Sequence, residues 1–286
     1  MRAMILVLVL SACKQAFGLD ETQVVPPSDA QYFDAPADAP YACPPAGETP
    51  QFSRLFHQIA QSCLYYTSSG PLGRASALCR EPVAQVAEGP SEGPLAPVVG
   101  LADVGTQRFD LVRLVPEGDE LFVRHWDTGT VVGRIRRFRR GGDNAFTSAA
   151  DVTLQGTTID SFVQFGAPSR GPRRRMMLRN GPGALQEVEI GETGVAQQIA
   201  VYTEAQFGVD VLLSTPNMTA DGLRIVFGGQ RDGQLTFYSD RATVSDRFSP
   251  GRVLEDVPAA FDTFLTEDCS RLYFSALGSI LWVPRR

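Results

Sequence analysis

The chain has 286 residues, 43% of them hydrophobic, which is enough apolar material for one all-β domain or two smaller domains. Its formal net charge of −6 argues against general nucleic-acid binding, because that function needs a basic surface to neutralise phosphates. We therefore expect no nucleic-acid partner.

The N-terminus reads MRAMILVLVLSAC. Arg2 supplies a positive charge, residues 4–10 form an apolar run too short to span a membrane as a helix, and small residues precede Cys13. This arrangement resembles the lipobox of bacterial lipoproteins, which implies that residues 1–12 are a signal peptide and that Cys13 is lipidated. Lys14, where inner-membrane retention usually shows an Asp, implies an outer-membrane anchor, with the domain in the periplasm or at the cell surface. The alternative is a buried N-terminal strand with a chance cysteine.

A linker is predicted over residues 13–50. From residue 20 onward it is rich in Pro, Ala and Asp and has little periodicity. Such a composition cannot bury enough apolar surface to fold alone, so we expect an extended tether that holds the domain off the membrane. The alternative is an interaction tail.

A short phrase recurs in the remaining chain, residues 51–286. Residues 219–229 (TADGLRIVFGG) and 266–276 (TEDCSRLYFSA) each place a turn before a strand of alternating apolar residues, residues 115–126 have the same form, and residues 175–178 are a weaker copy. A phenylalanine also recurs shortly before a strand, at Phe146, Phe207 and Phe248. A period of about 50 residues built from short strands is typical of propeller blades. The sequence therefore predicts an all-β propeller of about five blades, with six possible.

The two best copies also resemble a known repeat. Asp221 and Phe227 fit the turn and the strand-ending aromatic of the WD-like repeat in TolB-type proteins. Asp268 and Phe274 fit in the same way, while Cys269 replaces the turn glycine. As a whole, the chain resembles predicted lipoproteins of unknown function from myxobacteria. The resemblance implies a propeller at the cell envelope and carries over no activity.

Apart from Cys13, the chain has four cysteines, an even number consistent with disulfides in an oxidising compartment. Cys63 and Cys79 flank two strand-like runs joined by Gly-Pro-Leu-Gly, so a bridged hairpin is the preferred pairing among three possible connectivities. Cys43 and Cys269 would then pair by elimination and pin the end of the tether to the last blade. The segment 52–60 is ambiguous between a strand that closes the ring and a short helix.

The sequence offers little catalytic chemistry. His57 and His125 are the only possible imidazole bases and no Gly-x-Ser-x-Gly motif occurs, so no catalytic set is predicted. The cysteines are too dispersed for metal-ligand spacing, and we expect neither a metal nor a cofactor. The alternative is a glycosidase with carboxylates that converge on the propeller axis. Its candidate residues are Asp119, Asp151, Asp160, Asp210 and Asp262.

Two arginine clusters stand one repeat apart. The first consists of Arg134, Arg136, Arg137, Arg139 and Arg140, and the second of Arg170, Arg173, Arg174 and Arg175. Equivalent positions of adjacent blades lie side by side, so the clusters could form one patch that pairs with carboxylates or phosphates. The alternative is that they are solvated, charged strands that discourage aggregation. We predict a lipid-anchored binding or scaffold module whose partner is an envelope protein or an anionic polysaccharide.

Overall fold

The computed structural model describes residues 24–25, 43–69, 73–103, 107–127, 133–155, 163–180, 185–276 and 278–286. The predicted signal peptide, Cys13 and Asp160 lie outside these ranges. Within them, no helix has the length and apolar character needed to cross a membrane.

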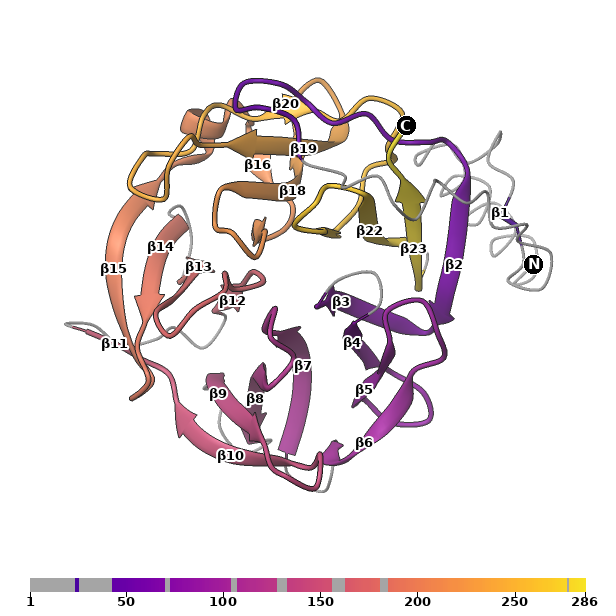
Figure 1. Cartoon of the computed structure of the whole chain (residues 1–286), viewed down its shortest axis with the longest axis vertical. Coiled ribbons are helices and arrows are strands. Elements are labelled where there is room, and N and C mark those ends of the chain that lie inside the picture. The colour runs from indigo at the N-terminus through magenta and orange to yellow at the C-terminus, as the bar shows by residue number, and fades with distance from the viewer. Residues whose placement is uncertain are drawn as a thin grey trace, which may run out of the picture.

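The described residues form five β-sheets arranged around a central axis, which confirms the predicted propeller and sets the blade number at five (Figure 1). From the axis outward, blade 1 contains β3 (Cys63–Ser68), β4 (Arg74–Cys79), β5 (Gln85–Pro90) and β6 (Ala96–Ala102). Blade 2 contains β7 (Gln107–Leu114), β8 (Glu120–Asp127), β9 (Arg134–Arg140) and β10 (Phe146–Asp151). Blade 3 contains β12 (Gln164–Phe165), β13 (Arg174–Arg179), β14 (Leu185–Ile190), β15 (Val195–Tyr202) and, parallel to β15, β11 (Thr153–Leu154).

In blade 4 the inner position is split between two short strands. Blade 4 contains β16 (Val211–Leu212), β17 (Asn217–Met218), β18 (Arg224–Gln230), β19 (Gln234–Asp240) and β20 (Arg252–Val253), preceded by a 3-10 helix, η2 (Glu204–Phe207). Blade 5 contains β21 (Asp262–Leu265), β22 (Arg271–Ala276), β23 (Ser279–Pro284), β2 (Phe56–Gln61) and, parallel to β2, β1 (Val24–Val25).

The ring closes in blade 5, where β2 from the N-terminal part of the chain pairs with β23 from the C-terminus. The ambiguous segment 52–60 therefore contains the closing strand. Both predicted disulfides are present: Cys63 bonds to Cys79 across the β3–β4 hairpin, and Cys43 bonds to Cys269. Figure 1 shows residues 43–55, which directly precede β2, running along the outside of blades 4 and 5.

The repeated phrase forms the turn between the first and second strands of a blade. In blade 4, the carboxylate of Asp221 accepts a hydrogen bond from the backbone N–H of Leu223 (2.9 Å), and Gly222 has a φ of 71°. In blade 5, Asp268 accepts the N–H of Ser270 (3.0 Å), while Cys269 has a φ of 57°. This left-handed conformation favours glycine, so the disulfide-bonded Cys269 fills a position where blade 4 has glycine. The phrase is architectural because it reverses the chain at an equivalent place in the blades that carry it.

Five clusters of buried apolar residues fill the five spaces between consecutive blades. On β13, Met176 faces blade 2 and Met177 faces blade 4. On β18, Phe227 faces blade 3 and Val226 faces blade 5. Each blade is therefore covered on both sides, and its central strands are hydrophobic at successive positions. Burying one such side chain contributes about 1.5–3 kcal/mol, so stacking of neighbouring blades is the main source of stability.

Candidate functional site

One position recurs at the start of the second strand of every blade. In all five blades, a backbone N–H before the turn donates to the carbonyl oxygen of this residue, over 2.8 to 3.1 Å. The equivalent residues are Arg74, Glu120, Arg175, Arg224 and Arg271. Blade 2 thus carries an acid where the other four blades carry an arginine. The charge on the neighbouring strand is inverted as well. Glu120 pairs in register with Arg139 in blade 2, whereas Arg175 pairs with Glu189 in blade 3.

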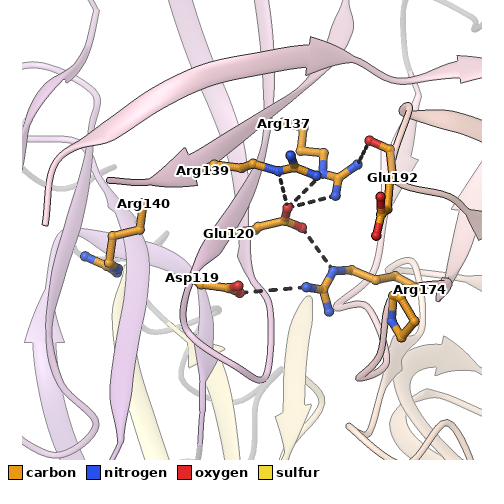
Figure 2. A pocket seen from close by; sticks show the side chains of 8 residues that line it. Asp119, Glu120, Arg137, Arg139, Arg140, Arg174 and Glu192 are labelled. Carbon is orange, nitrogen blue, oxygen red and sulfur yellow. Dashed lines mark hydrogen bonds and ion pairs between the residues drawn. The ribbon is translucent and has the colours of Figure 1, made fainter. Parts of the chain in front are cut away.

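This inversion gathers three guanidinium groups around Glu120, as Figure 2 shows. One carboxylate oxygen of Glu120 accepts from Arg137 Nη2 (2.7 Å) and Arg139 Nε (2.8 Å). The other accepts from Arg174 Nε of blade 3 (3.1 Å), which also donates to Glu117 through Nη1 (2.8 Å). Glu120 is 4% exposed. This buried carboxylate joins the two predicted arginine clusters, because Arg137 and Arg139 belong to the first and Arg174 to the second.

A pocket of about 260 Å³ opens at this junction between blades 2 and 3. Its lining residues are Asp119, Glu120, Arg137, Arg139, Arg140, Pro172, Arg174 and Glu192. Arg137 is held at the pocket floor, because its Nη1 donates to the backbone carbonyl oxygens of Gly191 (3.0 Å) and Glu192 (2.8 Å). The side chains of Arg139 and Asp119 are 49% and 61% exposed, so they form the solvent-facing rim.

Arg140 also lines the pocket, but its charge is used elsewhere. It forms a bidentate ion pair with Glu88 of blade 1, and its Nε donates to the carbonyl oxygen of Gly118 (3.0 Å). Arg241 of blade 4 repeats this arrangement: its Nε donates to Gly222 (2.9 Å) and its Nη atoms pair with Glu187 of blade 3. These arginines link consecutive blades, which is a structural role.

The same two arginines explain part of the recurring phenylalanine pattern. The guanidinium carbon of Arg140 lies 4.2 Å from the ring centroid of Phe146, and Arg241 lies 4.2 Å from Phe248. Both distances are within the range of cation–π attraction. Phe207 differs, because it packs on other aromatic rings in the core between blades 3 and 4.

The structure does not bring all nine predicted arginines together. Arg134 and Arg136 face Asp151 on the outer strand β10, and Arg134 stands at the end of β9 remote from the pocket. In the second cluster, Arg175 pairs with carboxylates of its own blade, Glu187 and Glu189. Arg134, Arg136 and Arg175 therefore do not contribute to the pocket.

Two further predicted arginines lie in the turn between β12 and β13, on the same face as the pocket. Arg170 pairs with Glu267 (2.8 Å), and its side chain is 54% exposed. Arg173 pairs with Glu189 (3.3 Å), and its side chain is 79% exposed. Surface ion pairs of this kind contribute about 0–1 kcal/mol to the stability of the fold. These side chains can therefore leave their present partners and bind a ligand with little loss of free energy. Together with Arg139 they form what we call the arginine face: Arg139, Arg170 and Arg173.

Sequence reasoning missed Glu120 as the centre of this site. Alignment of the repeated turns places Glu120 beside Arg224 and Arg271, so the sign inversion in residues 115–126 was a usable signal. The partner that the inversion attracts, Arg174, comes from the next blade, and only the stacking of blades 2 and 3 reveals it.

The electrostatics of Glu120 follow from its arginine partners. Burial alone would raise the pKa of this carboxyl, but hydrogen bonds from Arg137 and Arg139 and the charges of Arg137 and Arg174 outweigh it and hold the pKa below its ordinary value. The ionised form of Glu120 is therefore stabilised in the folded protein.

We expect the Glu120→Gln variant to show a pH-dependent loss of stability. A lowered folded-state pKa adds stability that is fully present above the unfolded pKa, about 4.3, and is lost as the pH falls through the folded pKa. The difference in free energy of unfolding between wild type and variant should thus be largest near neutral pH and shrink below about pH 4. Urea unfolding across this range measures it. A difference that stays constant with pH would contradict the assignment.

The carboxylates proposed for a glycosidase do not converge in the described part of the chain. Asp262 on β21 is near the axis, where it forms a bidentate ion pair with Arg113 of blade 2 (2.6 and 3.3 Å) and accepts from Asn217 (3.1 Å). Asp151 lies on an outer strand and Asp119 on the pocket rim. The remaining candidates are Asp210, which is exposed before β16, and Asp160, which lies outside the described residues.

Among the described residues, no three histidine, cysteine, aspartate or glutamate side chains are grouped so that they could hold a metal ion.

No family model matches the sequence, and neither does any curated protein. Solved structures match it at low identity. A structure from a study of two prolyl endopeptidases shares 13% identity over 76% of this chain and 32% of its own, with a TM-score of 0.38. A putative 6-phosphogluconolactonase from Bacteroides uniformis shares 13% over 74% and 62%, with a TM-score of 0.43. A putative glycoside hydrolase from Parabacteroides distasonis shares 8% over 80% and 87%, with a TM-score of 0.48. The chain thus spans less than two thirds of the first two proteins, and the likeness concerns the fold.

Proposed function

We propose that the protein is a binding or scaffold module of the cell envelope, anchored by lipid at Cys13, whose arginine face binds an anionic partner. The single observation that carries this proposal is the pocket at Glu120. Its floor is fixed by buried charge pairs, while Arg139 projects from its rim into solvent. A rigid floor beneath an exposed arginine lowers the cost of ordering the site when a partner binds.

The arginine face suits an acidic partner because its three guanidinium groups lie at one end of two adjacent blades. Each guanidinium can form bidentate hydrogen bonds with a carboxylate or a phosphate. The partner classes that fit are an envelope protein with an acidic surface and an anionic polysaccharide.

The way in which residues 43–47 are attached to the propeller supports the proposal of an N-terminal anchor. Cys43 is bonded to Cys269 in the turn of blade 5, and Gly47 N–H donates to Asp240 of blade 4 (2.9 Å). Tension from a membrane anchor would therefore enter blade 5 through a covalent bond and would not have to peel β2 from β23. A disulfide at this point is useful for a tethered domain in an oxidising compartment.

Crosslinking in intact cells, followed by mass spectrometry of the captured material, tests the proposal. We expect wild type to capture a specific envelope partner and the triple variant Arg139→Gln, Arg170→Gln, Arg173→Gln to lose it. The matched control changes Arg80, Arg108 and Arg134 to Gln. These side chains are exposed at the opposite ends of blades 1 and 2, so the control should capture as wild type does. Equal capture by wild type and both variants would overturn the proposal.

A further inference from the structure

The pocket rim between blades 2 and 3 presents donors and acceptors side by side. Arg139 donates to Glu120 through Nε, and among the described residues its two terminal nitrogens have no protein acceptor. Asp119 approaches Arg174 only at 3.7 Å and is largely exposed. Glu192 is exposed too, and within the described chain its carboxylate forms no ion pair. The rim thus offers one free bidentate donor next to two carboxylate acceptors.

We propose that this pocket takes one acidic sugar unit, a uronate residue of an anionic polysaccharide. The inference rests on the proposed binding function and assigns its ligand chemistry. The uronate carboxylate would pair with the terminal nitrogens of Arg139, and the ring hydroxyls would donate to Asp119 and Glu192. A uronate supplies one negative charge and several hydroxyl donors, which is the set that the rim complements.

An acidic polypeptide fits this rim less well. Consecutive aspartate or glutamate side chains supply acceptors only, so those that do not reach Arg139 would face the negative charges of Asp119 and Glu192. The volume points the same way. At about 260 Å³ the pocket is smaller than ordinary drug-sized ligand sites, so it suits a single ring.

The pocket floor sets where the ligand would sit. Arg137 and Arg174 have side chains that are 5% and 8% exposed, and both are held on Glu120. Since Arg139 shares that carboxylate, its Nε is held on Glu120, and Figure 2 shows its guanidinium beside that of Arg137. The donor is therefore positioned before the ligand arrives.

Equilibrium binding to the full-length protein tests the proposal with three probes: a short oligogalacturonide, its methyl ester and polyglutamate. The ester keeps all of the ring hydroxyls and removes the charge of the carboxylate. We expect the oligogalacturonide to bind at least about tenfold more tightly than either of the others, since a lost charge-assisted hydrogen bond weakens binding by that order. Equal binding of polyglutamate would overturn the sugar assignment and indicate an acidic protein partner.

Variants distinguish the contact of the carboxylate with Arg139 from the contacts of the hydroxyls with Asp119 and Glu192. Arg139→Gln should weaken oligogalacturonide binding at least about tenfold, while Arg134→Gln on the same strand should leave it unchanged. The double variant Asp119→Ala, Glu192→Ala should weaken oligogalacturonide binding and strengthen polyglutamate binding. Unfolding curves of each variant exclude a folding defect. Oligogalacturonide affinity unchanged by Arg139→Gln would overturn the proposal. If cells show arginine-dependent capture but no oligogalacturonide binds, the sugar assignment fails and the binding function stands.

Discussion

Replacing Glu187 by Gln is expected to lower the free energy of unfolding by about 3–5 kcal/mol, the usual cost of breaking a buried ion pair. Glu187 and Arg241 have side chains that are 2% and 1% exposed, and they join blades 3 and 4 through two hydrogen bonds of 2.9 and 3.1 Å. The amide of Gln is nearly isosteric, so the loss reports the uncompensated charge of Arg241 and not a cavity. Urea unfolding at neutral pH measures the change.

Glu189→Gln is the matched control for this variant. Glu189 is two residues further along β14 and pairs with Arg173 and Arg175, but its side chain is 20% exposed and both partners remain partly in solvent. We expect it to lower the free energy of unfolding by less than about 1 kcal/mol. If the two variants lose the same amount of stability, the buried Glu187–Arg241 pair does not stabilise the contact between blades 3 and 4 more than a surface ion pair does.

Removing the Cys43–Cys269 disulfide by changing both residues to Ala is expected to destabilise the protein by about 5 kcal/mol in the chain-entropy model. The bond closes a loop with a sequence separation of 226 and holds the segment before β2 against blade 5. Without it, the unfolded chain gains entropy, and the closing strand β2 loses the covalent support that precedes it. Urea unfolding of the oxidised proteins measures the effect. Hydrogen exchange should locate the largest loss of protection in β2 and β23.

The second disulfide is the internal control. Cys63 and Cys79 are separated by 16 residues, so the same model gives about 3 kcal/mol for changing both to Ala. A greater loss of stability from the short loop than from the long one would contradict the view that ring closure depends on the Cys43–Cys269 bond.

The repeat pattern was sufficient to predict the fold, because a blade cannot bury its faces alone and must stack. The Asp221 and Asp268 turns mark equivalent places in two blades, and their spacing gave the approximate blade number. The weak copy near residue 175 proved to belong to a complete blade. The N-terminal blade was harder to predict from the sequence, since the described part of its first turn, at Ser69 and Arg74, has no Asp-Gly pair.

The candidate site was only partly predictable, because ion pairing depends on which face of a strand a residue occupies. On β9, Arg137 and Arg139 face blade 3, whereas Arg136 and Arg140 face away from it. A run of arginines in the sequence therefore separates into an exposed pocket rim, a pocket floor and a link to blade 1. The carboxylates that divide the run come from other strands, so the arginine count alone overestimates the free positive charge.

The most direct test of the binding role is chemical footprinting of arginine side chains in intact cells with an arginine-selective dicarbonyl reagent. We expect the arginine face (Arg139, Arg170 and Arg173) to be protected in cells relative to the purified protein. The control residues Arg80, Arg108 and Arg134, at the opposite ends of blades 1 and 2, should be modified equally in both. Equal modification of the two sets in cells and in the purified protein would contradict a partner on the arginine face.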